Sequence, residues 1–278
     1  MLRFVIALLP EARPLIARYR LELAAGDGAF KLYREGDVAL VVSGAGKVAS
    51  AAAVAYLHAR AAGGRHAAWI NAGIAGHGRR AVGEAVLAHA VRDRASGACW
   101  YPPQVFAPPA ATGEVVTVDA VEERYEGDAA YEMEASGFYP TACRFATAEL
   151  VQCLKVVSDG PGASPYGLSA SRVEQLIGDR LEELERLAEA LLPLSAEVRR
   201  LEEDPPELGE LLGRWRFTVT ETRQLRRLVQ RWRALAPGRP LAVGELASLR
   251  RGKDVVRRLR EWVAGMAGEM IADGGRTC

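Results

Sequence analysis

The sequence predicts an α/β protein whose central sheet is covered by helices, followed by a helical extension. Two observations lead to this fold class. Short apolar runs bounded by Gly, Pro, Asp or Ser alternate with helical stretches, which is typical of a sheet packed between helices. The chain then changes character at an acidic segment with two prolines, Glu202–Pro206, and continues in amphipathic helical patterns. We therefore expect an α/β domain at residues 1–198 and a basic helical extension at residues 199–278.

Six short apolar runs have the length and the flanking residues of buried strands. They are Phe4–Leu9, Val38–Val42, Ala67–Asn71, Ala85–His89, Val115–Val118 and Leu154–Val157. The first run is too short for a secretory signal peptide, and Pro10 ends it with no cleavage site behind. We therefore interpret it as the first buried strand.

Five stretches are expected to be helices. They are Lys47–Ala62, Glu134–Phe145, Ser169–Leu192, Glu221–Leu235 and Lys253–Met270. The last three are amphipathic, with large apolar residues at steps of three or four. Ser169 or Ser171 is placed to cap the third helix, and Pro237–Pro240 separates the last two.

The composition is that of an ordinary globular protein. The chain has 278 residues, 49% of them hydrophobic and 26% charged, which is enough apolar mass for a sizeable core. The four cysteines and four histidines show no metal-ligand spacing, and no apolar run approaches the ~18 residues of a membrane span. The simplest interpretation is a reduced, cytoplasmic protein with no metal, no other cofactor and no membrane partner.

Four segments carry a family resemblance. They read VIALLPEA near the start, SGAGKVASAAA at 43–53, INAGIAG at 70–76, and YEMEASGFY followed by KVVSDG at 131–160. In this order they resemble the nucleoside phosphorylase/nucleosidase family, most closely its methylthioadenosine/S-adenosylhomocysteine nucleosidase branch. The Glu-Met-Glu motif, followed by a strand ending in Ser-Asp, is the most specific of them. The resemblance covers roughly residues 1–195 and implies a three-layer phosphorylase-like fold with a central mixed sheet.

Asp159 is the expected general acid. Cleavage of a nucleoside needs an acid near the departing base and an oriented nucleophile near the sugar carbon. Asp159 follows the strand Leu154–Val157 and should lie at the carboxyl edge of the sheet, where α/β folds bind ligands. The resemblance implies that Asp159 protonates a purine at N7. The alternative is that Asp159 only starts the turn Asp-Gly-Pro-Gly.

Three glutamates and a methionine complete the expected site. Glu134 can accept hydrogen bonds from two neighbouring ribose hydroxyls, Met133 would lie against the sugar face, and Glu132 is a further candidate contact. The resemblance implies that Glu11 orients the attacking water. The structural alternative for Glu134 and for Glu11 is an acidic residue at a helix N-terminus, where the helix dipole favours it.

Glycines are expected to bring two turns close to the substrate. Gly44, Gly46 and Gly73 lie in segments that follow predicted strands, where glycine allows close approach of the backbone to a ligand. Tight packing between strand and helix is the alternative. 

The sequence departs from the phosphorylases at two positions. Asn71 and Ile74 stand where phosphorylases of this family carry Arg and Ser, and a phosphate needs charge-assisted donors. This favours water over phosphate as the nucleophile, although Arg13 could compensate. The nucleosidase branch also has Ser at the position of Ile74, so a polar contact near the water or the sugar is lost.

The pocket wall also departs from the family. The stretch 90–114 is considerably shorter than its counterpart in the resembled enzymes, and Val121 stands where an aromatic residue usually contacts the base. A shortened wall is compatible with a larger substrate, a pocket completed by a partner, or lost activity. The prediction is a nucleosidase-like hydrolase of purine nucleosides, with adenosine-derived thioethers as one substrate class. The alternatives are a nucleoside phosphorylase and a catalytically weakened nucleoside-binding protein.

The charge of the extension is unusual. Residues 214–260 contain 14 Lys and Arg against 3 Asp and Glu, a net charge of +11, so the remainder carries −10. The arginines interleave with Trp215, Trp232 and Trp262, a pattern seen in nucleic-acid-binding proteins. Two other interpretations stay open: tryptophans in a core beneath a solvated basic face, or pairing of the basic segment with the acidic remainder, within one chain or across a homodimer. We expect a compact helical appendage that is marginally stable unless it docks on a larger body.

Overall fold

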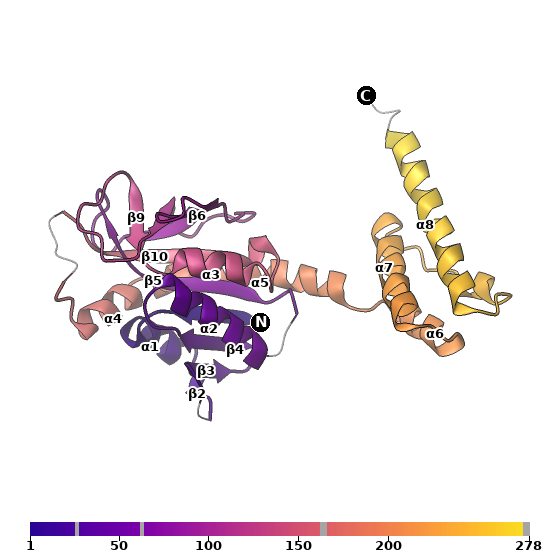
Figure 1. Cartoon of the computed structure of the whole chain (residues 1–278), viewed down its shortest axis with the longest axis horizontal. Coiled ribbons are helices and arrows are strands. Elements are labelled where there is room, and N and C mark those ends of the chain that lie inside the picture. The colour runs from indigo at the N-terminus through magenta and orange to yellow at the C-terminus, as the bar shows by residue number, and fades with distance from the viewer. Residues whose placement is uncertain (26–27, 62–63, 162–165, 275–278) are drawn as a thin grey trace. The chain divides into compact units, whose positions relative to one another are not determined.

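The computed structural model describes residues 1–25, 28–61, 64–161 and 166–274, with side chains up to residue 266. The chain divides into two compact units, Met1–Arg200 and a second unit that begins at Leu201 (Figure 1). Each unit has its own core.

The first unit is built on one mixed sheet with helices between its strands. Its strands are β1 (Leu2–Ile6), β2 (Glu22–Leu23), β3 (Lys31–Glu35), β4 (Val38–Val42), β5 (Ala68–His77), β6 (Ala85–Asp93), β7 (Cys99–Trp100), β8 (Ala111–Thr117), β9 (Ala129–Glu132) and β10 (Val151–Asp159). Its helices are α1 (Leu9–Arg18), α2 (Lys47–Arg60), α3 (Ala135–Ala142), a short 3-10 turn η1 (Ala148–Leu150), α4 (Ala170–Gly178) and α5 (Leu181–Glu202).

The sheet is open on one side and closed on the other. Its strand order is β10-β6-β8-β9-β5-β1-β4-β3-β2, and β10 also pairs with β5, so five strands join into a ring. The pairs β4–β1, β1–β5 and β5–β10 are parallel, whereas β10 pairs antiparallel with β6. Parallel strands end at the same edge, and the ends of β1, β5 and β10 therefore lie together.

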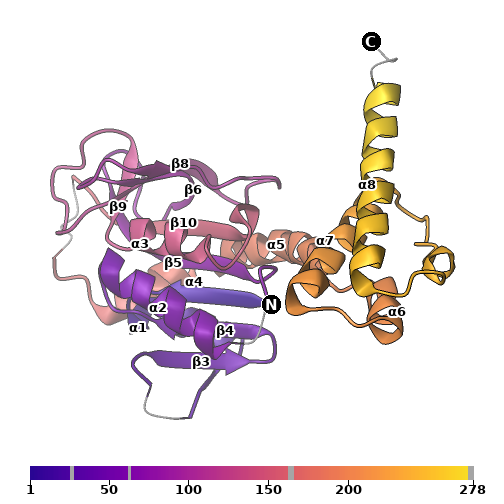
Figure 2. The ribbon, with the colours of Figure 1, turned by 45° about the vertical axis from the view of Figure 1, so that its right-hand side comes forward.

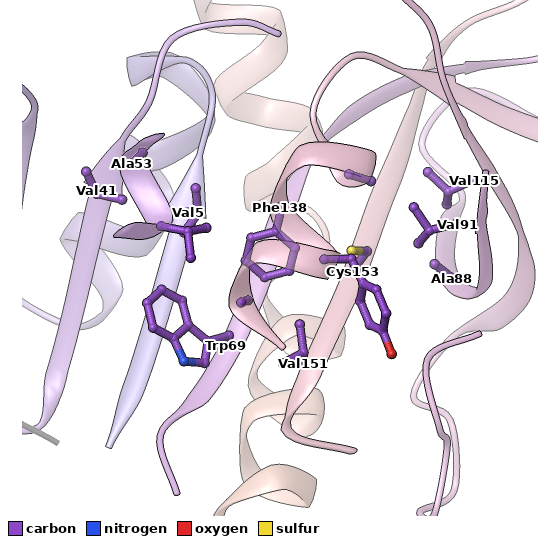
Figure 3. Close-up of a cluster of buried hydrophobic side chains, with 14 of the residues drawn as sticks. Val5, Val41, Ala53, Trp69, Ala88, Val91, Val115, Phe138, Val151 and Cys153 are labelled. Carbon is purple, nitrogen blue, oxygen red and sulfur yellow. The ribbon is translucent and has the colours of Figure 1, made fainter. Parts of the chain in front are cut away.

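Apolar side chains on the two faces of the sheet make two separate cores, as the three-layer prediction requires. On one face Phe138 of α3 is directed toward Trp69 of β5 and Cys153 of β10 (Figure 3). On the other face, Phe4 and Ile6 pack with residues of α1, α4 and α5. Alternate residues of β1 enter opposite cores, which is the side-chain period of a strand buried on both faces. Figure 2 shows α2 and α3 in front of the sheet.

The first expected strand is wrong at its end. β1 stops at Ile6, and α1 already begins at Leu9. Pro10 stands in the first turn of that helix, where no N–H is needed from it and its fixed φ suits the helix. Glu11 therefore lies in the first turn of α1.

The helix expected at Ser169–Leu192 is two helices. α4 ends at Gly178, a poor helix former, and α5 begins at Leu181 and extends to Glu202. Ser169 caps α4 as expected, since its hydroxyl accepts the Arg172 N–H at 3.2 Å.

The turn expected at Asn71–Gly76 is wrong, because β5 continues through it to His77. A Cβ at Gly73 would lie 2.8 Å from Glu11 Oε1, so glycine here admits a neighbouring side chain to the strand. The earlier glycine segment is a turn: Gly44 and Gly46 have φ of +81° and +101°. The pattern of apolar runs did not predict four strands that are short or largely polar, namely β2, β3, β7 and β9.

The second unit is a small helical bundle. It contains α6 (Pro206–Arg214), α7 (Val219–Leu235), the 3-10 turn η2 (Val243–Leu246) and α8 (Gly252–Gly274). Eleven large apolar residues of the two expected helices join its core, with further leucines and valines from α6 and η2. They are Leu225, Leu228, Val229, Trp232, Leu235, Val255, Val256, Leu259, Trp262, Val263 and Met266. Thr218 and Glu221 form a capping box at the start of α7. Among the described residues, none of the helices is both long and apolar enough to cross a lipid bilayer.

Candidate active site

A cavity of about 270 Å³ opens at the carboxyl edge of the sheet, where β1, β5 and β10 end. Side chains from distant parts of the first unit line it. The lining residues are Ala7, Leu8, Glu11, Ala45, Ile74, Ala75, Gly76, Val118, Val121, Glu122, Tyr125, Tyr131, Glu132, Met133, Glu134, Ser158, Asp159 and Leu168. Seven of the ten residues singled out in the sequence are among them.

Asp159 is the last residue of β10 and is buried at the cavity. Its carboxylate accepts a hydrogen bond from the Tyr125 hydroxyl at Oδ2 and one from the Ser158 hydroxyl at Oδ1. Asp159 therefore does not merely start a turn, because both of its oxygens have defined partners within the site.

Glu11 is fixed by the backbone. The N–H of Leu8 donates to Oε2 at 2.8 Å and the N–H of Ile74 donates to Oε1 at 2.9 Å. Burial raises the pKa of Glu11, while these two hydrogen bonds and the charge of Lys155 oppose the rise. A buried carboxylate with a raised pKa is suited to accept a proton near neutral pH.

Glu134 precedes α3 and faces the same cavity. Its Oε1 accepts the Gly46 N–H at 2.9 Å, and its Oε2 lies 3.9 Å from Lys155 Nζ. Burial, together with the charge of the nearby Glu132, raises the pKa of Glu134 to about 7. One carboxylate oxygen is thus held by the backbone, while the other lies at ion-pair distance from Lys155.

Glu132 differs from the other two glutamates because its carboxylate is consumed inside the protein. It accepts the Thr117 hydroxyl at 2.6 Å and the backbone N–H groups of Glu134 and Ala135, and it pairs with Lys155 at 2.8 Å. Burial opposes ionisation of Glu132, but the Lys155 charge and these hydrogen bonds lower its pKa. Glu132 lines the cavity but its carboxylate is bound within the protein, so its expected ribose contact stays a prediction.

The three apolar candidates line the cavity, and the three glycines do not. Met133 and Ile74 are half-buried in the wall, and Val121 is more exposed. Gly46 instead donates its N–H to Glu134, and Gly73 leaves room for Glu11. Gly44 donates its N–H to Ala7 O at 2.9 Å. The three glycines therefore hold the glutamates and the turn, and their expected substrate contacts stay predictions.

The positions relevant to phosphate are occupied by neutral or distant groups. Asn71 is buried within β5, and its side-chain amide donates to Val5 O at 2.9 Å. Arg13 is exposed and pairs with Glu174 at 3.1 Å, so it does not compensate. None of the described residues that line the cavity is Arg or Lys, whereas five are Asp or Glu.

Sequence reasoning missed Lys155, Ser158 and Tyr125. Lys155 is 1% exposed and carries its charge into the sheet beneath two glutamates. Ser158 precedes Asp159 in the quoted Ser-Asp motif, which is the signal that could have found it. Tyr125 lies in the loop between β8 and β9, and only its proximity to the Glu-Met-Glu strand hinted at a place in the site.

Comparison with known proteins identifies the fold. No protein-family model matches the sequence, and no protein of curated function matches it significantly. Solved structures do match. The Arabidopsis thaliana 5′-methylthioadenosine nucleosidase has a TM-score of 0.57 at 16% identity, over 68% of this chain and 95% of that one. The S. pneumoniae 5′-methylthioadenosine/S-adenosylhomocysteine nucleosidase, bound to a transition-state inhibitor, has a TM-score of 0.54 at 20% identity, over 68% and 99%.

A third match is the corresponding nucleosidase of Colwellia psychrerythraea in complex with adenine. Its TM-score is 0.50 at 22% identity, over 66% of this chain and 95% of that one. These likenesses cover nearly the whole of the solved proteins and about two thirds of this chain. The α/β part of this chain is thus similar in fold to the methylthioadenosine/S-adenosylhomocysteine nucleosidases, as its sequence motifs predicted.

Proposed function

We propose that the first unit hydrolyses the N-glycosidic bond of a purine nucleoside. The observation that carries the proposal is that Glu11, Glu134 and Asp159, from three distant segments, face one cavity at the carboxyl edge of the sheet. Spaced carboxylates in different environments are the general means of glycosidic cleavage. 

Each carboxylate has a role that follows from its surroundings. Asp159, at the end of β10, would bind and protonate the leaving base. Glu134 would accept hydrogen bonds from ribose hydroxyls through the oxygen that Gly46 leaves available. Glu11, held by two backbone N–H groups, would accept a proton from the attacking water.

Water is favoured over phosphate by charge. A phosphate dianion would enter a cavity lined by five acidic side chains and by no described Arg or Lys. Such a site repels an anion and offers it no charge-assisted donor. The solved protein from Colwellia psychrerythraea holds adenine and a Helicobacter pylori relative holds 5′-methylthioadenosine, which supports an adenosine-derived thioether as substrate class.

The test is a panel of purine and pyrimidine nucleosides, including 5′-methylthioadenosine, incubated with the full chain with and without phosphate. We expect release of a free purine base that does not depend on phosphate. Asp159→Asn keeps the shape of the side chain and removes its proton, so turnover should fall by about 10²–10⁴ with little change in binding. No base release from any nucleoside would reject the proposal, and release only with phosphate would make the protein a phosphorylase.

A nucleoside-binding protein without turnover remains the alternative. The specific observation in its favour is that both Asp159 oxygens already have internal partners, Tyr125 and Ser158. Calorimetry that shows nucleoside binding, with no product by chromatography, would establish this alternative.

We further propose a cytoplasmic location, supported by free thiols at Cys99, Cys143 and Cys153, and a homodimer by analogy with the fold.

A second candidate function concerns the second unit. All fourteen Lys and Arg residues between 214 and 260 are exposed. The turn after α6 lies against the start of α8, because Trp215 Nε1 donates to Leu249 O at 2.8 Å and a Cβ at Gly252 would lie 2.4 Å from Arg216 O. This packing brings together a group of cations that we call the α8 cluster. It consists of Arg216, Arg250, Arg251 and Lys253.

The α8 cluster has the properties of a phosphate-backbone contact. Within the described part of the chain none of its four cations forms an ion pair. Arg226, in contrast, pairs bidentately with Asp204, and Arg214 makes a single contact with Glu210 at 3.5 Å. The tryptophans belong to the core of this unit: Trp232 is buried, and Trp215 and Trp262 are partly buried against it. We therefore propose binding of nucleic acid through phosphates alone, without base stacking.

Fluorescence anisotropy with a labelled 30-nucleotide DNA tests this proposal on the full chain. Affinity should fall steeply between 50 and 200 mM salt, because neutralised phosphates release counterions. Replacing the α8 cluster by alanine should weaken binding at least tenfold and flatten the salt dependence. A control, R34A/R65A/R144A/R172A, removes four exposed arginines of the first unit and should bind normally. Absence of binding at low salt, or equal loss in both variants, would reject the proposal.

A further inference from the structure

Tyr125 is held at the base end of the cavity in an unusual backbone conformation. It lies in the loop between β8 and β9 with φ of +45°, a value that residues with a side chain rarely adopt, yet its side chain is only 5% exposed. Backbone strain of this kind persists only where the surroundings enforce it, and it gathers at functional sites.

Two glycines make the space for this residue. A Cβ at Gly76 would lie 2.2 Å from the Tyr125 ring and 2.6 Å from Asp159 Oδ2, and a Cβ at Gly78 would lie 2.5 Å from Tyr125 O. Tyr131 packs edge-on against the ring, with centroids 6.1 Å apart. Contacts with Gly76, Gly78 and Tyr131 therefore fix the position of Tyr125, although it lies in a loop.

The hydroxyl of Tyr125 forms a hydrogen bond with Asp159, the residue proposed to act on the base. It donates to Asp159 Oδ2, while the Ser158 hydroxyl donates to Oδ1. In this arrangement Asp159 accepts at both oxygens and presents no proton to a ligand. A base that reaches Asp159 has to replace the Tyr125 hydroxyl.

The size of the cavity agrees with an internal occupant. Its volume of about 270 Å³ lies just below the range of roughly 300–1,000 Å³ that is usual for small-molecule pockets. Val121, at the position where an aromatic contact was expected, is aliphatic and 46% exposed. The aromatic surface at this end of the cavity comes from Tyr125 and Tyr131.

We propose that Tyr125 occupies the base subsite and determines which bases enter it. A phenol that donates to a carboxylate resembles a heteroaromatic ring with an N–H donor, so a purine is the ligand class that can replace it. The inference rests on the proposed nucleoside site, and binding must displace the Tyr125–Asp159 hydrogen bond before the base can contact Asp159. 

Tyr125→Phe isolates the hydroxyl, because it keeps the ring and removes the hydrogen bond. Isothermal calorimetry with adenine should show at least about tenfold tighter binding to Y125F than to the wild type, since hydrogen bonds to charged groups are strong. Tyr101→Phe is the matched control, because Tyr101 is 70% exposed and does not line the cavity. A thermal melt of each variant establishes that it is folded.

Tyr125→Ala tests selection by the ring. Removing the ring should admit an adenine with a bulky N6 substituent, such as N6-benzyladenine, which the wild type should exclude. Unchanged or weaker adenine binding by Y125F, or exclusion of the bulky base by Y125A, overturns the inference. Tighter binding by Y125F without any nucleoside cleavage would keep the inference and reject the hydrolase. If the wild type cleaves a nucleoside but binds adenine as tightly as Y125F does, the hydrolase stands and the inference about Tyr125 is rejected.

Discussion

Replacing Lys155 by Met should destabilise the first unit strongly. Lys155 Nζ lies 2.8 Å from Glu132 Oε2, and the two side chains are 1% and 0% exposed. Burial lowers the pKa of Lys155, but the charges of Glu132 and Glu134 outweigh this and raise it, so the group is firmly cationic. Removing it leaves Glu132 as a buried carboxylate with no countercharge.

The magnitude follows from the cost of an unpaired buried charge. Breaking a buried ion pair by removing one partner costs about 3–5 kcal/mol. The lower end applies here, because the Thr117 hydroxyl and the N–H groups of Glu134 and Ala135 still bind Glu132. At about 2–4 °C per kcal/mol for a unit of this size, the midpoint of thermal unfolding should fall by roughly 6–12 °C.

Thermal and urea unfolding of K155M, beside two reference variants, measures this. Lys31→Met changes an exposed lysine and should leave stability within about 0.5 kcal/mol of the wild type. E132Q/K155M removes both charges while keeping an acceptor for Thr117, and should recover most of the loss. A loss below about 1 kcal/mol in K155M, or no recovery in the double variant, would refute the reasoning.

Two further predictions concern the glutamates. Glu134 has a folded-state pKa raised to about 7, above its value in the unfolded chain. Folding therefore opposes ionisation of Glu134, and this carboxyl lowers the free energy of unfolding as pH rises from its unfolded-state pKa toward 7. Urea unfolding at pH 5 and pH 8 should therefore show E134Q gaining about 1–3 kcal/mol relative to the wild type at the higher pH, and an equal difference at both pH values would contradict this. Gly73→Ala places a Cβ 2.8 Å from Glu11 Oε1 and should lower turnover about tenfold to a hundredfold by displacing that carboxylate. Gly178→Ala meets nothing within 4 Å and serves as the control, so equal activities of the two variants would count against a positioned Glu11.

The parts of the fold that sequence predicts are those governed by local pattern. Val38–Val42 is a strand as predicted, and α2 begins at Lys47 as predicted, because a glycine turn and an alanine-rich run fix its start. The end of the first strand was missed, since Leu8 and Leu9 continue the apolar run although Pro10 favours a helix start. A short apolar run does not distinguish the end of a strand from the start of a buried helix.

The sequence predicts those cavity residues that lie at the ends of strands. Asp159 and Glu134 were found because a charged residue next to an apolar run, within a family motif, has few structural explanations. Tyr125 and Lys155 were not found, since their roles depend on contacts across the sheet. The strand Leu154–Val157 contains Lys155 as its one polar residue, and the burial of that lysine follows only from the carboxylate of Glu132 beneath the cavity.

The most direct test of the central claim is release of a purine base from 5′-methylthioadenosine or a related nucleoside by the full chain, followed by chromatography with and without phosphate. We predict release that is independent of phosphate and is reduced about 10²–10⁴-fold in D159N, while the affinity for the base changes little. Absence of release across the nucleoside panel, or release that D159N leaves unchanged, would contradict the assignment of this cavity as a nucleosidase site.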